Sequence, residues 1–90
     1  MAKFLAIHTL PVPITPEEAM AVGNAVKSNV TVDAYWVSSW AQLNEEGKIV
    51  RIYCEWNAKN ADAIREVFSK IQVFPVDGIY GLAVVDPETL

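Results

Sequence analysis

The sequence predicts an α+β domain whose elements follow the order β-α-β-β-α-β. Three observations carry this prediction. Four segments are rich in β-branched, aromatic and other apolar residues, as strands are. Two segments begin with helix-capping residues, Thr15 and Asn60. A glycine-containing turn over residues 44–48 joins the second and third strand segments, which predicts an antiparallel hairpin.

The first strand is predicted over Lys3–Leu10, where apolar residues occupy both alternating faces. The prolines of 11–13 are expected to end it. Thr15 then precedes Pro16 and Glu18, and this spacing is typical of a capping box. We therefore expect a helix over Pro16–Ser28, with small and β-branched residues on its inner side.

The second half of the chain continues the alternation. Strands are predicted over Val30–Leu43 and Ile49–Trp56, with Gly47 in the turn between them. A helix over Ala61–Ile71 follows, because its apolar residues recur at helical spacing. Ile79–Val85 is the fourth predicted strand.

This order is the split βαβ arrangement of ferredoxin-like domains, a four-stranded antiparallel sheet with both helices on one face. Residues 1–90 are expected to form one such domain. Since 52% of the residues are hydrophobic and aromatic groups occupy both strand parities, something must cover the second face of the sheet. We expect a two-fold homodimer that packs sheet against sheet into an α/β barrel; the alternative is an apolar ligand site.

The charge pattern excludes several classes of function. The seven Lys and Arg residues are scattered and the net charge is -4, which argues against nucleic-acid binding. The longest uncharged run, Phe4–Thr15, is too short and too broken by prolines to cross a membrane, and the amino-terminal residues do not resemble a secretory signal. The single cysteine, Cys54, fits a reducing compartment, so we expect a cytoplasmic protein.

His8, the only histidine, is the first candidate for chemistry, because its imidazole could ligate a divalent metal or act as a base. The preferred interpretation is a half-buried strand histidine that is hydrogen-bonded to a neighbour or packed at an interface. If the first and third strands are neighbours, His8 can face Glu55 or Cys54, but not both. Cys54 itself is expected to be a small buried hydrophobe rather than a reactive thiolate.

Asp33 and Glu55 are the two carboxylates within predicted strands, and either could serve as a general base or metal ligand. For Glu55 the preferred interpretation is an ordinary surface pair with Arg51, two residues away on the same strand face.

Three tryptophans in ninety residues are a high proportion. They and the strand tyrosines are typical of a core and a dimer interface, or of an aromatic-walled pocket for a small planar or apolar ligand. The candidate pocket residues are Tyr35, Trp36, Trp40, Tyr53, Glu55 and Tyr80.

The opening segment 1–8, the stretch Tyr53–Ala58, the helix start Asn60–Arg65 and the turn Phe74–Tyr80 together resemble a bacterial group of small ferredoxin-like domains. Part of that group is known as nickel-binding proteins, and the rest has no assigned function. The resemblance implies a dimeric α/β barrel and a metal, such as nickel, bound through the first-strand histidine, which His8 matches.

The leading hypothesis is therefore a small dimeric ferredoxin-like protein that binds a metal ion or small ligand near His8. One alternative is a cofactorless α/β-barrel monooxygenase or isomerase, in which His8 or Asp33 acts on a substrate held by the aromatic residues. The other is a protein-interaction module that uses the aromatic surface.

Overall fold

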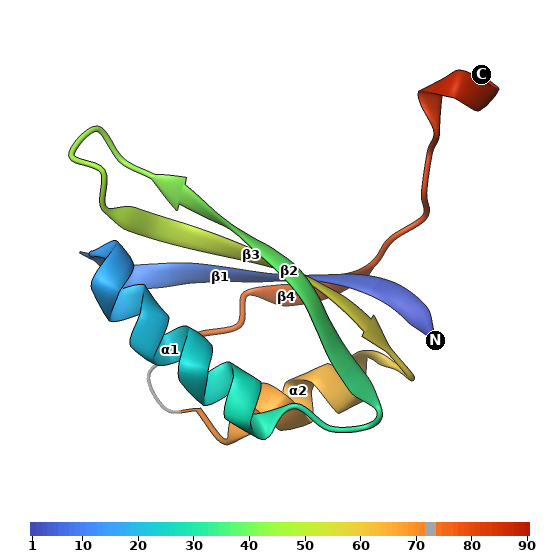
Figure 1. Cartoon of the computed structure of the whole chain (residues 1–90), viewed down its shortest axis with the longest axis horizontal. Coiled ribbons are helices and arrows are strands. Elements are labelled where there is room, and N and C mark those ends of the chain that lie inside the picture. Colours follow the sequence, from blue (N-terminus) through green and yellow to red (C-terminus); the bar gives the residue numbers. More distant parts are fainter. Residues whose placement is uncertain (72–73) are drawn as a thin grey trace.

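The computed structural model describes residues 1–71 and 74–90. It contains the predicted alternation of strands and helices, followed by a short 3-10 turn (Figure 1). The elements are β1 (Ala2–Ile14), α1 (Pro16–Asn29), β2 (Ala34–Leu43), β3 (Ile49–Ala58), α2 (Ala61–Ser69), β4 (Gly78–Gly81) and the 3-10 turn Pro87–Thr89.

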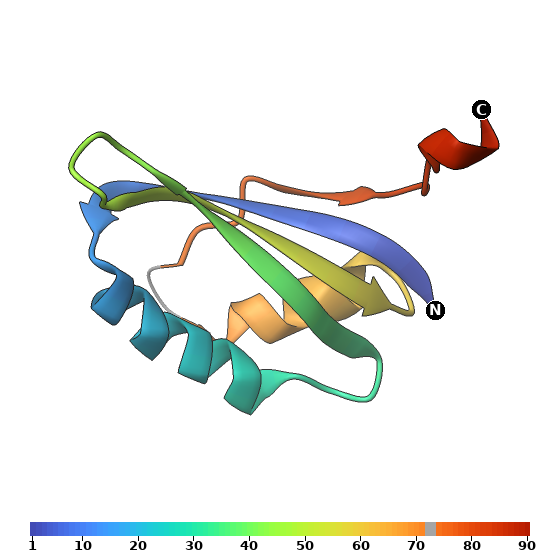
Figure 2. The same ribbon diagram turned by 45° about the horizontal axis from the view of Figure 1, so that its top comes forward.

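The four strands form one antiparallel sheet in the order β2-β3-β1-β4. Both helices lie on the same face of this sheet, while the other face is uncovered (Figure 2). The ferredoxin-like α+β fold and the adjacency of the first and third strands are thus confirmed. We call the helix-covered side the inner face and the other side the outer face.

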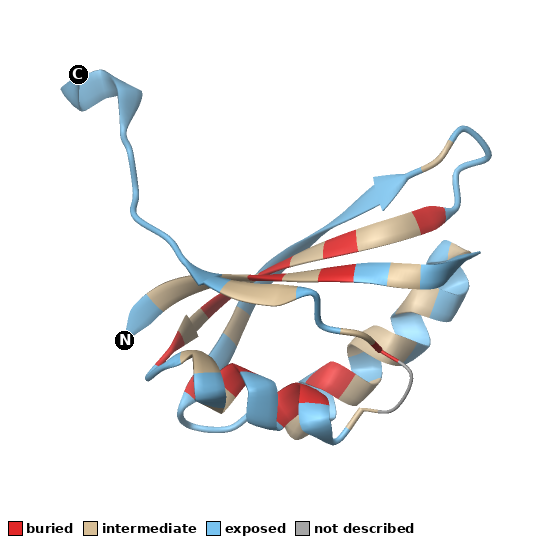
Figure 3. Ribbon diagram, turned by 180° about the vertical axis from the view of Figure 1, so that it is seen from behind, coloured by how far each residue is buried: buried red, intermediate tan, exposed pale blue. Residues whose placement is uncertain are grey.

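Side chains on the inner face form the hydrophobic core together with α2 (Figure 3). Alternate residues of β3 are buried, as are three apolar residues of α2 at the predicted helical spacing, Ile64, Val67 and Phe68. Trp56 is fully buried at the centre of this core and meets the Phe68 ring edge-on at 5.6 Å between centroids. In α1, by contrast, Val26 alone is buried.

Local signals set the starts of both helices as predicted. The Thr15 hydroxyl accepts from the Glu18 backbone N–H, and the Glu18 carboxylate accepts from the Thr15 N–H, which completes the capping box. The Asn60 side chain accepts from the Ala63 N–H at 2.9 Å. Gly47 has a φ of 78° in the hairpin turn, which is the left-handed conformation expected of it.

The first strand is longer than predicted, because it continues through Pro11 and Pro13 to Ile14. Its pairing with β3 breaks between Thr9 and Ile14, and β4 pairs only with the segment Phe4–Ile7. Pro11 and Pro13 therefore lie in a segment whose backbone is not paired with a neighbouring strand. Their missing N–H groups cost no hydrogen bond of the sheet, so the strand can continue through them.

Other predicted boundaries were wrong as well. Strand β3 continues two residues past the predicted end, to Ala58, and α1 one residue past it, to Asn29. Residues 30–33 form a turn rather than the start of β2, since the Thr31 hydroxyl and carbonyl accept from the Asp33 and Ala34 backbone N–H groups. Helix α2 ends at Ser69, two residues before the predicted end.

The fourth strand stops at Gly81 instead of continuing to Val85. Its partner explains this difference. Gly81 pairs with Phe4, the Leu82 N–H donates to the Lys3 carbonyl, and β1 begins at Ala2. Residues beyond Leu82 therefore have no neighbouring strand to pair with.

Neither helix, within the part of the chain that the structure describes, has the length and apolar character needed to cross a membrane.

Candidate functional site

An apolar cavity of about 150 Å³, partly open to solvent at the exposed residues Ser39–Ala41, lies between α1 and the inner face of β2 and β3. Helix α1 contributes mainly small side chains to its wall, and the sheet contributes larger ones. The cavity is lined by Ala19, Val22, Gly23, Val26, Trp36, Ser39, Trp40, Ala41, Ile49, Ile52, Cys54 and Phe74. A space of this size holds a benzene-sized molecule.

The polar atoms of the cavity wall are bonded to one another in a short series. The indole Nε1–H of Trp36 donates to the Ser39 hydroxyl at 2.7 Å, and that hydroxyl donates to the Cys54 sulfur at 3.1 Å. The hydrogen-bond donors of Trp36 and Ser39 are thus both used within the wall. A bound molecule would therefore make van der Waals contacts with the wall rather than hydrogen bonds.

Cys54 is 3% exposed and is the one titratable residue of the lining. Burial raises the pKa of its thiol to about 11, although the hydrogen bond from Ser39 acts in the opposite direction. The thiol is therefore protonated at neutral pH and is a poor nucleophile and metal ligand. This confirms the expectation that Cys54 behaves as a small buried hydrophobe.

The cavity exists because α1 presents small residues to large rings. A Cβ placed on Gly23 would lie 3.7 Å from Cη2 of Trp36, an ordinary contact distance. The Trp36 indole stacks in turn on Trp56, with centroids 6.3 Å apart and planes inclined by 20°. Stacked rings thus form part of the sheet side of the cavity, while α1 contributes one buried residue, Val26.

His8 lies beside the cavity rather than in its wall, from which Phe74 separates it. The imidazole is fully buried, stacks on Phe74 at 4.3 Å between centroids, and lies 4.6 Å from Phe68. Its Nδ1 donates to the Pro75 carbonyl at 2.8 Å. Burial lowers the pKa of His8 below its ordinary value, and the bond to Pro75 and the charge of Asp77 only partly offset this effect. The imidazole is therefore neutral at physiological pH.

The surroundings of His8 do not fit a resident divalent metal ion within one protomer. One ring nitrogen is engaged by Pro75, and the other, Nε2, is buried without a hydrogen-bond partner among the described residues. In residues 1–71 and 74–90 no group of three histidine, cysteine or acidic side chains could hold a metal. Nickel and zinc sites need several such donors.

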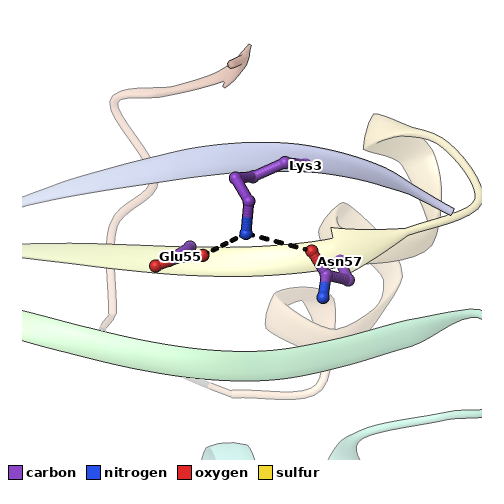
Figure 4. Close-up of polar contacts among 3 residues, drawn as sticks. All are labelled: Lys3, Glu55 and Asn57. Atoms are coloured by element: carbon purple, nitrogen blue, oxygen red, sulfur yellow. Dashed lines mark hydrogen bonds and ion pairs between the residues drawn. The ribbon is translucent and has the colours of Figure 1, made fainter. Parts of the chain in front are cut away.

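Glu55 lies on the outer face, where Lys3 donates to its carboxylate and, at 3.3 Å, to the Asn57 side chain (Figure 4). The predicted pairing of Glu55 with Arg51 was wrong. Arg51 instead donates through Nε to the Thr9 hydroxyl at 3.0 Å. Lys3 lies directly across the ladder from Asn57, beside Glu55, whereas a partner two residues along the same strand must stretch to reach it.

Asp33 belongs to the turn before β2, where its side chain is exposed and its backbone carbonyl accepts from the Lys59 N–H at 2.8 Å. It does not line the cavity and is distant from His8 in the sheet.

The structure divides the predicted pocket residues between the two faces of the sheet. Trp36, opposite Trp56, belongs to the inner face and lines the cavity. Trp40 also lines it, although its Cα partner is Tyr53 of the outer face. The remaining members lie on the outer face by their register: Tyr35, Tyr53, Glu55 and Tyr80.

Several cavity residues were missed from the sequence, notably Ser39, Phe74 and Gly23. The sequence does predict small residues on the inner side of the 16–28 helix. Small side chains facing large tryptophan rings could also have indicated an unfilled space between the helix and the sheet.

The sequence matches the family model described as nickel responsive protein SCO4226-like over residues 4–81. Among solved structures it is similar to SCO4226 from Streptomyces coelicolor A3(2), with a TM-score of 0.72 and 19% sequence identity over 94% of this chain and 100% of that chain. At that identity the likeness supports the fold. No curated protein matches the chain.

Proposed function

We propose that this chain, which belongs to the nickel responsive SCO4226-like family, is a binding protein for a small apolar molecule held between α1 and the inner face of the sheet. The observation that carries this proposal is the cavity of about 150 Å³ whose polar wall atoms are already bonded to one another. Such a wall favours an apolar, planar occupant of about six to nine non-hydrogen atoms.

Binding is favoured over catalysis by the chemistry of the lining. General acid–base or nucleophilic catalysis requires a group that can exchange a proton or carry charge near neutral pH. The lining offers Cys54 alone, and its thiol pKa of about 11 keeps it protonated. His8, the candidate base of the enzyme alternative, faces Phe68 and Phe74 instead.

We also propose that two copies associate through their outer faces. Support comes from the side chains there, because Leu5, Ile7 and Tyr53 are only half-buried, and Trp40 and Tyr80 are each 55% exposed. Among the charged groups there, Lys3 and Glu55 are paired with each other, and Arg51 donates to the Thr9 hydroxyl. Paired charges lower the cost of covering this face. Light scattering on the purified chain tests the association, and a monomer at all accessible concentrations would contradict it.

Toluene is a suitable probe of the cavity, because it is planar, apolar and has seven non-hydrogen atoms. Titration is followed at the Trp36 indole Nε1–H resonance in ¹⁵N–¹H spectra, since that group lies in the cavity wall. We expect a saturable shift with a Kd of about 0.1–1 mM, or about 4–5.5 kcal/mol, which is within the limit for ligands of this size.

Two variants of α1 form a matched pair for this titration. Ala19→Leu fills the cavity, because Ala19 lines it, whereas Ala21→Leu adds the same atoms to an exposed position of the same helix. We expect Ala19→Leu to weaken toluene binding at least tenfold and Ala21→Leu to leave it unchanged. Equal affinity in both variants, or no saturable shift in the native chain, would overturn the proposal.

A further inference from the structure

We propose that residues 82–85 of one copy add as a strand to the open edge of β2 in a second copy, so that two chains exchange arms. This inference rests on the homodimer proposed above and names the segments that would hold it together. It concerns the stretch after β4, which we call the arm (residues 82–90). The arm lies beyond the residues 4–81 that the family model matches.

The arm leaves the body of the molecule (Figure 2). Its apolar residues Leu82, Val84 and Val85 are exposed. Its last backbone bond to the body is from the Leu82 N–H to the Lys3 carbonyl. Val84 and Val85 are 78% and 71% exposed. Single exposed apolar residues are common. A consecutive run of Leu, Ala, Val and Val in an extended segment is instead typical of a β-strand, and here no neighbouring strand among the described residues pairs with it.

The arm nevertheless has local order at its far end. The Asp86 carboxylate accepts from the Glu88 N–H at 3.0 Å, and the Thr89 hydroxyl donates to the Asp86 carbonyl at 2.8 Å. These bonds close the 3-10 turn Pro87–Thr89, with proline at its first position. The turn ends the extended stretch, so the part free to pair is 82–85.

The edge of β2 is the natural acceptor. The sheet order leaves β2 paired with β3 on one side and, among the described residues, with no strand on the other. Over its ten residues β2 contains no charged residue and no proline, two of the means by which edge strands avoid association; a third, a bulge, is present between Trp36 and Ser38. Val37, Trp40 and Leu43 are 40%, 55% and 56% exposed along it.

The arm of one chain cannot pair with the β2 edge of the same chain. The order β2-β3-β1-β4 puts the arm and the β2 edge on opposite sides of the sheet, about 14 Å apart at three strand spacings. A two-fold axis resolves this, because each arm then reaches the β2 edge of the other copy, and both contacts form together.

The surface area shows that the chain is less compact than a monomer of its mass. The chain exposes 5978 Å², whereas a folded monomer of 10.0 kDa is expected to expose about 5,240 Å². An excess of about 740 Å² is expected of a body with a projecting arm. The radius of gyration of 13.7 Å likewise exceeds the ~12 Å of a compact domain of this length.

The test compares the full chain with three variants by sedimentation equilibrium. Val84→Asp places a charge in the arm, Val37→Asp places one on the β2 edge, and Thr89→Asp places one in the distal turn as the matched control. We expect the first two each to raise the dimer Kd at least tenfold and the control to change it less than twofold. Circular dichroism of each variant verifies that the fold is retained.

Amide hydrogen exchange gives the second readout. The β2 amides that do not bond to β3 should be protected in the dimer and should exchange at least tenfold faster in Val84→Asp, while β3 amides keep their protection. A dimer whose Kd and β2 protection are the same in Val84→Asp would overturn the arm exchange but leave the outer-face dimer intact. A monomeric full chain would overturn both and leave the cavity untouched.

Discussion

The Ser39 hydroxyl donates to the Cys54 sulfur at 3.1 Å, across the pairing of β2 with β3. The same hydroxyl accepts from the Trp36 indole, so its single proton and one lone pair are both committed. The wall of the cavity therefore offers an occupant little hydrogen bonding. These two hydrogen bonds restrict the polarity of a ligand more than the volume of the cavity restricts its size.

Phenol should bind more weakly than toluene. The wall offers the added hydroxyl no free partner, but Ser39 and Trp40 of the lining are exposed, so the hydroxyl keeps part of its hydration. We expect a Kd about two- to fivefold higher. Ser39→Ala should narrow this difference, because it frees the Trp36 N–H to donate to the phenol oxygen. The measurement is the shift of the Trp36 indole resonance with each probe. Tighter binding of phenol to the native chain would contradict the apolar character assigned to the site.

Gly23→Ala should stabilise the protein. Its new Cβ would make an ordinary contact with Trp36, and replacing a helical glycine by alanine contributes about 0.5–1 kcal/mol. Gly47→Ala is the opposite control, since Gly47 has a φ of 78° and nothing within 4 Å of its Cβ position. There the strain should destabilise by about 1 kcal/mol. Urea unfolding compares the two, and a destabilising Gly23→Ala would mean that α1 packs more tightly than described.

His8 should make the protein less stable in mild acid. Burial lowers the His8 pKa in the folded state below the ordinary 6.5, so at pH values under 6.5 the unfolded chain binds a proton that the folded chain excludes. Stability should therefore fall as the pH drops from 6.5 to 5, by at most about 1.4 kcal/mol per pH unit. Above 6.5 both states are neutral and this dependence should vanish.

The variant His8→Asn isolates that effect, because an amide can still donate to the Pro75 carbonyl but does not titrate. We expect its unfolding free energy to be flat between pH 7 and 5. The lowered pKa values of Asp77 and Glu18 affect stability only in stronger acid. An equal acid dependence in the native chain and the variant would show that another group is responsible.

Nickel titration should not distinguish His8→Asn from the native chain. The imidazole is enclosed by Phe68 and Phe74, and its Nδ1 is engaged by Pro75, so it offers one buried nitrogen to a metal that needs several donors. Isothermal calorimetry with nickel measures this directly. Loss of nickel binding in the variant alone would restore His8 as a ligand.

Local signals explain why most of the fold could be predicted from sequence. Thr15 and Asn60 cap helices through atoms that lie within three residues, and Gly47 occupies its turn for reasons of backbone conformation alone. The end of β4 could not be predicted in this way. It depends on where β1 begins, and the composition of residues 82–85 contains no information about a strand eighty residues earlier.

The candidate site was harder to predict because of a bulge. The register of β2 shifts between Trp36 and Ser38, which places Trp36 and Ser39 on the inner face together. Simple alternation would instead group Trp36 with Trp40. The aromatic residues were thus identified as candidates, but Ser39 and the small residues of α1 that complete the cavity were not.

A crystal structure of the protein grown from toluene-saturated solution tests the central claim most directly. The account predicts electron density for one toluene molecule between α1 and the inner face of the sheet, in contact with Cys54 and Phe74, with little movement of the sheet. Toluene bound only on the outer face, or a native crystal in which α1 closes onto Trp36 and leaves no space, would contradict it.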